Sequence, residues 1–341
     1  MLDRKVRSVR TPRGRGTRLA AAGLALALLA VACGGQPGAD PTTDGVTATP
    51  DPDSSGLSVA VASFDLAVGE DQRLLAGVFG ADRALLAFGE ITFQLGYLGD
   101  EPGGETELTQ EATATYLPIP GMEPEADEDV PRFLDGETGN GVYAGEVDLD
   151  RPGFWGLRVI AELQDGDVMQ GQATFQVQEE PGVHAVGDEA PRTQNPTVAD
   201  AEAGDIDPAS LDSRAGGTDG TIPDQHLHDA VIAEELEAGR PLVVAVTTPV
   251  YCVSRFCGPL TNELAELAHE YEDTATFVQL EVWKDHEAQE LNEAAAEWIL
   301  PRSGAGGNEP WVFLVDGDGV ISHRWDNVLD IEELTAALAE L

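Results

Sequence analysis

Two cysteines separated by four residues are the side chains of this sequence with the clearest capacity for chemistry. Cys252 and Cys257 follow an apolar, β-branched run at residues 242–246, and they precede a helical pattern with Pro259 near its first turn. The N-terminus of a helix presents unpaired N–H groups and a partial positive charge, which stabilise a thiolate and lower its pKa. The spacing therefore predicts thiol chemistry at Cys257.

The N-terminal segment predicts export and a lipid anchor. Seven basic residues among the first 20 precede an apolar run at residues 19–32, which is too short to span a bilayer and is typical of a secretory signal. The tetrapeptide ending at Cys33 resembles a bacterial lipobox, in which the cysteine is lipidated and becomes the mature N-terminus. Ordinary signal peptidase cleavage is the alternative. We expect attachment to the extracytoplasmic face of the cell membrane through Cys33.

With Cys33 lipidated, Cys252 and Cys257 are the remaining thiols in a compartment that favours disulfides, and we expect them to pair. Closing so short a loop would contribute only about 2 kcal/mol to stability. The leading hypothesis is therefore a redox-active pair in which Cys257 attacks or is attacked and Cys252 resolves. A static disulfide in a binding or scaffold lipoprotein is the alternative. No cofactor and no metal site are expected.

The charge balance excludes one class of partner. The formal net charge is −43, although the first 20 residues are basic. Such a field repels the phosphates of nucleic acids, so we expect no nucleic-acid binding. The expected partners are a redox partner protein or an exported cysteine-containing protein, and the membrane through the lipid anchor.

Short runs of alternating hydrophobicity fill residues 57–180. They predict seven strands, at 57–61, 73–79, 91–97, 112–117, 142–149, 154–163 and 169–177, with a hairpin at Asp165–Gly166. This pattern predicts an all-β immunoglobulin-like antiparallel sandwich. Residues 141–157 resemble the periplasmic sandwich domains of the FixH and YtkA type.

The hydrophobic pattern of residues 181–341 differs from that of residues 57–180. Residues 181–221 show no periodicity and are expected to form a linker, and His226 and His228 are expected to be surface residues. From residue 242 onward the predicted order is β-α-β-α-β-β-α, which is that of an α/β thioredoxin fold. The predicted organisation is a signal peptide (1–32), a disordered tether (33–56), a β-sandwich domain (57–180), a linker (181–221) and a thioredoxin-like domain (222–341).

Two motifs carry a family resemblance over residues 222–341. Phe256-Cys257-Gly258-Pro259 resembles the start of the thioredoxin active site, and residues 309–316 resemble the cis-proline strand of TlpA-like lipoprotein thiol-disulfide proteins in the peroxiredoxin-like superfamily. The resemblance implies that Pro310 binds the substrate backbone. Leu260 stands where the second thioredoxin cysteine would be, and Cys252 is the expected partner of Cys257 instead.

Two other families share part of the cysteine pattern. Peroxiredoxins of the Q type also carry cysteines with four residues between them, but Pro249 and Glu309 stand where that family has a threonine and an arginine. Copper chaperones of the Sco type have cysteines one residue closer and a late histidine, and no histidine stands near Pro310. Both remain alternatives to thiol–disulfide exchange.

Overall fold

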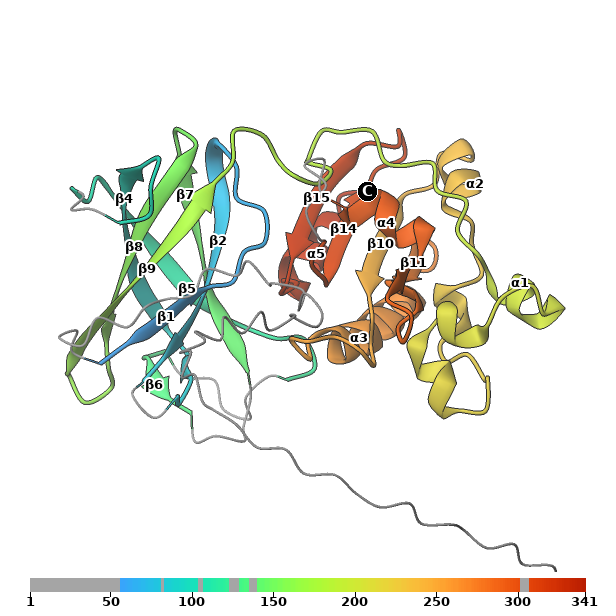
Figure 1. Ribbon diagram of the computed structural model, residues 1–341, viewed down its shortest axis with the longest axis horizontal. Coiled ribbons are helices and arrows are strands. Elements are labelled where there is room, and N and C mark those ends of the chain that lie inside the picture. Colours follow the sequence, from blue (N-terminus) through green and yellow to red (C-terminus); the bar gives the residue numbers. More distant parts are fainter. Residues whose placement is uncertain (1–55, 81–82, 104–106, 123–128, 135–139, 301–306) are drawn as a thin grey trace, which may run out of the picture. The chain divides into compact units, whose positions relative to one another are not determined.

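Strands dominate the computed structural model, which describes residues 56–80, 83–103, 107–122, 129–134, 140–300 and 307–341 (Figure 1). These residues belong to one compact unit of the chain, residues 43–341. The first strands in chain order are β1 (Ser58–Val61), β2 (Gly69–Phe79), β3 (Leu86–Ala87), β4 (Glu90–Gly99), β5 (Gln110–Pro118), β6 (Arg132–Phe133), β7 (Gly141–Leu149), β8 (Gly153–Glu162) and β9 (Val168–Val177).

Seven of these strands form one antiparallel sheet in the order β1-β2-β7-β5-β4-β8-β9. The two ends of this sheet approach each other, because Gly56 bridges Gln170 of β9 and the Leu57 N–H donates to the Gln170 carbonyl at 3.3 Å. The sheet is therefore a nearly closed barrel. The short strands β3 and β6 pair separately.

The barrel core follows from the alternation in the sequence. Along β8 every second side chain from Trp155 to Ala161 is buried, because successive side chains of a strand point to opposite faces. The Asp165–Gly166 turn leads from β8 into β9, which pairs with it antiparallel as expected, and Gly166 has the positive φ of 85° that favours glycine. Each of the seven strands predicted for this region is found.

The remaining elements follow an irregular segment. They are α1 (Val198–Ala203), α2 (Ile232–Glu237), β10 (Leu242–Thr247), α3 (Cys257–Glu270), β11 (Thr276–Glu281), β12 (Trp283–Asp285), β13 (Glu290–Leu291), α4 (Glu293–Ile299), β14 (Trp311–Val315), β15 (Ile321–Asp326) and α5 (Ile331–Leu338). Three short 3₁₀ turns lie between α1 and α2, at Pro208–Ser210, Ser213–Gly217 and Gln225–Leu227.

A second sheet has four strands in the order β11-β10-β14-β15. The pair β10 and β11 is parallel, and the other two pairs are antiparallel. Side chains of β10 alternate between two hydrophobic clusters, one shared with α2 and α4 and the other with α3 and α5. Helices therefore cover both faces of this sheet, and β10 is buried throughout.

The segment expected to be a linker holds ordered structure. It contains α1 and two of the 3₁₀ turns, and a small cluster of its own is formed by Val198, Leu211, Ala215 and Ile222. The prediction that His228 lies on the surface is wrong, because its side chain is fully buried. The domain boundaries given above stay a prediction.

Polar side chains link the two sheets. Arg324 of β15 lies 2.9 Å from the carboxylate of Asp65, and Arg73 of β2 donates to the Val328 carbonyl at 2.8 Å. Asn327 donates to the Ala62 carbonyl at 2.9 Å. The contacts of Arg324 and Arg73 give partners to arginine side chains that are largely removed from water, as buried charges require.

The predicted fold class, an immunoglobulin-like sandwich followed by an α/β thioredoxin fold, is wrong. The described residues are mostly β, with a nearly closed seven-stranded antiparallel sheet and helices over only 20% of them. The alternating pattern shows that one face of each strand is buried, but it is the same for two packed sheets and for one sheet that curls upon itself. In the second sheet only the pair β10–β11 is parallel. Two of the helices that cover this sheet are short, since α2 has six residues and α4 has seven.

Candidate functional site

The two cysteines are joined, as predicted. Cys252 lies in the loop after β10, and Cys257 is the first residue of α3. A disulfide connects them, with 6.0 Å between their Cα atoms. The apolar strand and the amphipathic helix thus hold the two ends of a nine-residue loop, and the disulfide closes the last part of it, residues 252–257.

The two sulfur-bearing residues differ in their access to solvent. Cys257 is 0% exposed and Cys252 is 9% exposed, so both residues are buried and Cys252 is the less buried of the two. Of the two residues, only Cys252 retains some exposed surface. This ranking could not be read from the spacing of the cysteines.

Hydrogen-bond donors gather on the sulfur of Cys252. The backbone N–H of Cys257 donates to this Sγ at 3.4 Å, and the hydroxyl of Ser254 lies 3.2 Å from it. The Ser254 oxygen itself accepts the N–H of Phe256 at 3.4 Å. Arg255 has a φ of 66°, a left-handed conformation that is uncommon for a side chain of this size and that turns the loop back toward the helix.

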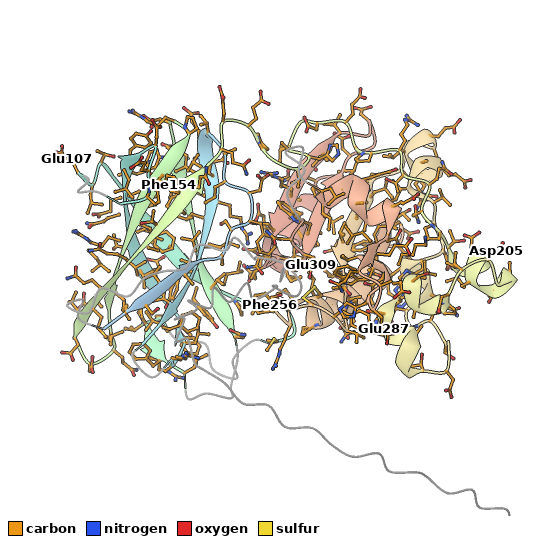
Figure 2. The ribbon with its side chains drawn as sticks, in the orientation of Figure 1. Glu107, Phe154, Asp205, Phe256, Glu287 and Glu309 are labelled. Atoms are coloured by element: carbon orange, nitrogen blue, oxygen red, sulfur yellow. A yellow bond between two sulfur atoms is a disulfide. The ribbon has the colours of Figure 1, made fainter. Side chains whose placement is uncertain are left out.

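Pro310 lies at the same edge of the sheet as the disulfide loop. Val246 of β10 pairs with Trp311 of β14, so the residues next along the two antiparallel strands, Thr247 and Pro310, are neighbours. The Glu309–Pro310 peptide bond is cis, as the resemblance implied. Figure 2 marks Glu309 and, at the start of α3, Phe256.

Two carboxyl groups lie around this edge, one buried (Glu281) and one partly buried (Glu309). Glu281, the last residue of β11, is 1% exposed, and burial raises its pKa to about 7 even though it accepts the N–H of Ser213 at 2.9 Å. Burial also raises the pKa of Glu309 to about 7, and the neighbouring charge of Glu281 adds to this shift. The two groups therefore titrate near neutral pH, a property often found at functional sites.

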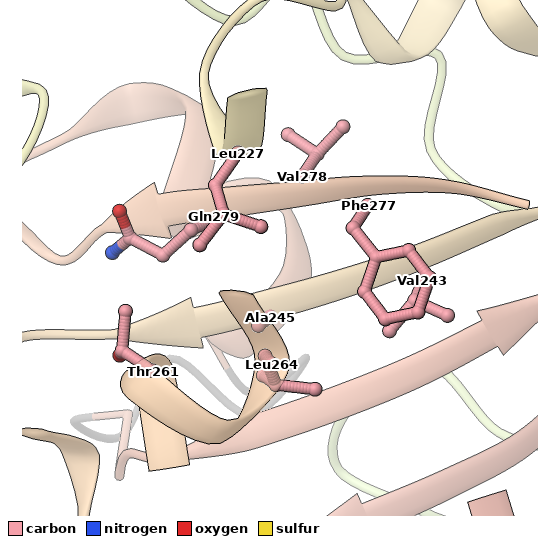
Figure 3. Close-up of a pocket in the computed structure, with 8 residues that line it drawn as sticks. All are labelled: Leu227, Val243, Ala245, Thr261, Leu264, Phe277, Val278 and Gln279. Carbon is pink, nitrogen blue, oxygen red and sulfur yellow. The ribbon is translucent and has the colours of Figure 1, made fainter. Parts of the chain in front are cut away.

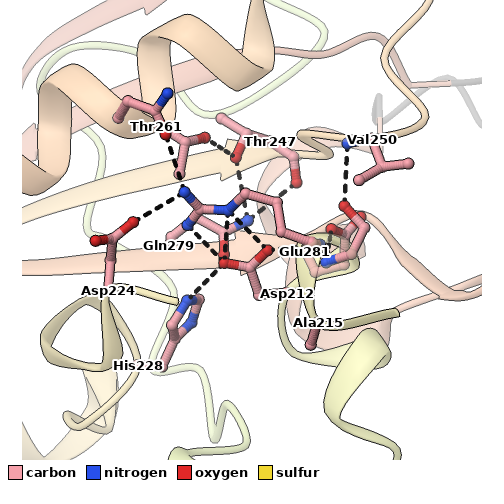
Figure 4. A network of polar contacts seen from close by, with 12 residues as sticks. Asp212, Ala215, Asp224, His228, Thr247, Val250, Thr261, Gln279 and Glu281 are labelled. Atoms are coloured by element: carbon pink, nitrogen blue, oxygen red, sulfur yellow. Dashed lines mark hydrogen bonds and ion pairs between the residues drawn. The ribbon is translucent and has the colours of Figure 1, made fainter. Parts of the chain in front are cut away.

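A polar network connects residues 212–228 to this edge of the second sheet (Figure 4). Asp212 is fully buried, and its carboxylate contacts Arg214 at 2.6 Å and Nε2 of the buried His228 at 3.4 Å. Burial opposes the ionised form of Asp212, but the hydrogen bonds from His228 and Arg214 outweigh it and lower its pKa to about 2. Arg214 also donates to Asn262 of α3 at 3.0 Å, so the network reaches the helix that begins at Cys257.

Exposed apolar side chains flank the accessible cysteine. Val250 is 55% exposed, Tyr251 is 37% exposed and Val253 is 89% exposed. Tyr251 stacks on His286 of the loop between β12 and β13, with 4.0 Å between the ring centroids. Three exposed apolar side chains therefore lie close to Cys252 in the sequence.

A small space between β10, β11 and α3 belongs to the core (Figure 3). Six of its eight lining residues are apolar, and all eight are buried. They are Leu227, Val243, Ala245, Thr261, Leu264, Phe277, Val278 and Gln279. We assign no ligand to it.

Some predicted features lie outside the described residues, among them Cys33, the signal segment and the tether. No helix in the described part of the chain is both long and apolar enough to cross a membrane. Within the same residues, no three histidine, cysteine or acidic side chains gather as metal ligands would.

Sequence reasoning missed three features of the candidate site. Glu281 could have been found, because it is a lone acid inside the apolar run 277–283. Ser254 could have been singled out as a hydroxyl two residues after Cys252. The contact between Asp212 and His228 has no local signal, because 16 residues separate them.

Comparisons with known proteins identify no family. No protein-family model and no curated protein matches the chain. Among solved structures, a crystal structure of MtrC from Shewanella baltica OS185 is similar at 9% identity, with a TM-score of 0.23, over 78% of this chain and 51% of that one. The chain thus spans about half the length of that protein. A TM-score this low carries no argument about fold or function.

Proposed function

We propose that this protein exchanges thiols and disulfides with a polypeptide partner through Cys252 and Cys257. The observation that carries the proposal is the asymmetry of the disulfide. Cys252, the less buried of the two residues, receives hydrogen bonds on its sulfur from Ser254 and from the Cys257 N–H, whereas Cys257 is fully buried as the first residue of α3. A purely structural bond in a six-residue loop would contribute only about 2 kcal/mol.

The exchange begins at the accessible sulfur. A partner thiolate attacks Sγ of Cys252, the Cys252–Cys257 bond breaks, and its electron pair leaves with Cys257 as a thiolate. A second thiolate of the partner then attacks the partner's own sulfur in the mixed disulfide. The products are a disulfide in the partner and two reduced cysteines in this protein, so two electrons move from the partner.

The reverse direction uses the same groups. The thiolate of Cys252 attacks a partner disulfide, and Cys257 then attacks Cys252 Sγ, which releases a reduced partner. This assignment exchanges the roles expected from the sequence, in which Cys257 was the attacking residue. It is supported by the 0% exposure of Cys257 and by the N–H donation from Cys257 to Cys252.

The location of the exchange is proposed from the sequence. Lipidation of Cys33 would hold the protein at the extracytoplasmic face of the cell membrane, with residues 33–56 as a flexible tether. Exported proteins with cysteines, or a redox partner protein at the same membrane, would be the substrates.

The reduction potential of the Cys252–Cys257 pair tests the proposal. The full chain is equilibrated with dithiothreitol or glutathione buffers, and the free thiols are trapped and counted by mass spectrometry. We expect a potential above roughly −300 mV, in the range of exchange-active dithiols. A much lower potential would mean that the disulfide is static, and the proposal would then be abandoned.

A further inference from the structure

The loop between the cysteines contains a hydroxyl group whose geometry points to a specific task. Ser254 lies two residues after Cys252 and is partly buried. Its oxygen is 3.2 Å from Cys252 Sγ, while the same oxygen accepts the Phe256 N–H at 3.4 Å. Because the backbone N–H occupies one lone pair of this oxygen, the hydroxyl hydrogen is free to point toward the sulfur.

We propose that Ser254 is a positioning residue that stabilises the thiolate of Cys252. The inference rests on the proposed function, since it concerns the reduced form of the same cysteine. In the oxidised protein the sulfur is only a weak acceptor, yet two donors, the Ser254 hydroxyl and the Cys257 N–H, already lie against it. On reduction the sulfur becomes an anion, and hydrogen bonds to a charged acceptor are roughly twice as strong as neutral ones.

Helix α3 supplies one of the two donors, the Cys257 N–H, but the hydroxyl donor comes from Ser254 in the loop. The Cys257 N–H is among the first N–H groups of α3, which have no partner within the helix. Every helix N-terminus offers such groups, whereas the hydroxyl at residue 254 is particular to this loop. The Ser254 side chain therefore tunes the thiolate beyond what the helix end provides.

Some charged groups around the loop stabilise the thiolate of Cys252, and others destabilise it. Arg255, inside the loop, is exposed, and its positive charge would favour a thiolate. The carboxyl groups of Glu281 and Glu309 at the neighbouring strand ends would disfavour one when ionised. His286, which stacks on Tyr251, would favour the thiolate when protonated. A test must therefore separate the effect of the hydroxyl on the thiolate from the effects of these charges, by comparing variants under identical conditions.

The test measures the pKa of Cys252 in the full chain. In a Cys257→Ala background, thiolate absorbance is followed during a pH titration with Ser254, Ser254→Ala and Ser254→Thr. We expect Ser254→Ala to raise the pKa of Cys252 by about one unit, the size of a hydrogen bond to a charged group, and Ser254→Thr to restore it. Ser322→Ala, which removes a hydroxyl that donates to Leu314 in the second sheet, serves as the control.

A second measurement keeps the inference falsifiable should the Cys257→Ala chain fold poorly. The pH profile of alkylation at Cys252 is recorded in the reduced two-cysteine protein, with and without Ser254→Ala, and the label is located by peptide mapping. An unchanged profile or an unchanged pKa in Ser254→Ala overturns the role of Ser254. A shifted pKa in a protein whose disulfide has a potential far below −300 mV would support Ser254 and reject the proposed function instead.

Discussion

The backbone N–H of Cys257 donates to Sγ of Cys252 across 3.4 Å, although the two residues are also joined by a disulfide. Cys257, the first residue of α3, thus contributes two groups to the site. Its sulfur forms the disulfide with Cys252, and its N–H donates a hydrogen bond to the Cys252 sulfur. This arrangement ties the reactivity of Cys252 to the position of the helix.

Single-cysteine variants should differ in what they trap. Cys257→Ser leaves the accessible Cys252 without its resolving partner, so we expect mixed disulfides with cysteine-containing proteins to accumulate. Cys252→Ser leaves only a sulfur that is 0% exposed, and few or no mixed disulfides should form. Non-reducing gels followed by mass spectrometry measure the yield. Equal trapping by both variants would contradict the assignment of Cys252.

Stability should decline between acid and neutral pH because of Glu281. Its pKa is raised from an unfolded value of 4.5 to about 7, so its favourable contribution is complete below pH 4.5 and is lost as the pH rises through about 7. The expected loss is about 3 kcal/mol, from roughly 1.4 kcal/mol per pKa unit.

Urea unfolding at pH 5 and pH 8 measures this change. Glu281→Gln should flatten the difference between the two pH values, whereas its effect at a single pH also includes the altered hydrogen bond to Ser213. Glu309→Gln removes the second titrating carboxyl and should reduce the slope as well. An unaltered slope in both variants would show that neither carboxyl titrates near neutral pH.

Removal of the buried carboxylate of Asp212 should weaken the packing of residues 212–228 on the second sheet. Asp212→Ala leaves Arg214 and His228 without their shared partner, and we expect a loss of about 3 kcal/mol in the free energy of unfolding. Asp224→Ala is the matched control, because Asp224 pairs with the same arginine but its side chain is 34% exposed. That control should cost less than about 1 kcal/mol. Similar losses in the two variants would mean that burial of Asp212 is unimportant.

Val253 should matter to a protein partner and not to a small thiol. Because the residue is 89% exposed, Val253→Ser should change the unfolding free energy by less than about 0.5 kcal/mol. We expect slower exchange with a cysteine-containing polypeptide and an unchanged rate with dithiothreitol. Stopped-flow measurements with the two reductants compare them. Equal rates for wild type and variant with both reductants would argue against an apolar docking contact at this residue.

Local pattern was a reliable guide to elements and a poor guide to architecture. The alternation along β8 and the turn at Gly166 are properties of a few adjacent residues, and the structure has both as expected. Closure of the barrel depends on Gly56 meeting Gln170, more than 100 residues away, and no short-range pattern encodes that meeting. The predicted fold class was wrong for this reason.

The sequence by itself determined that two thiols, a strand and a helix N-terminus occur within residues 242–270, because those features follow from residue types and spacing. It also determined a strongly acidic chain. Tertiary structure alone decided that Cys252 is less deeply buried than Cys257, that Glu281 and Glu309 share one sheet edge, and that His228 is buried against Asp212. Burial and pKa depend on which distant segments cover a side chain, and that is a property of packing between elements.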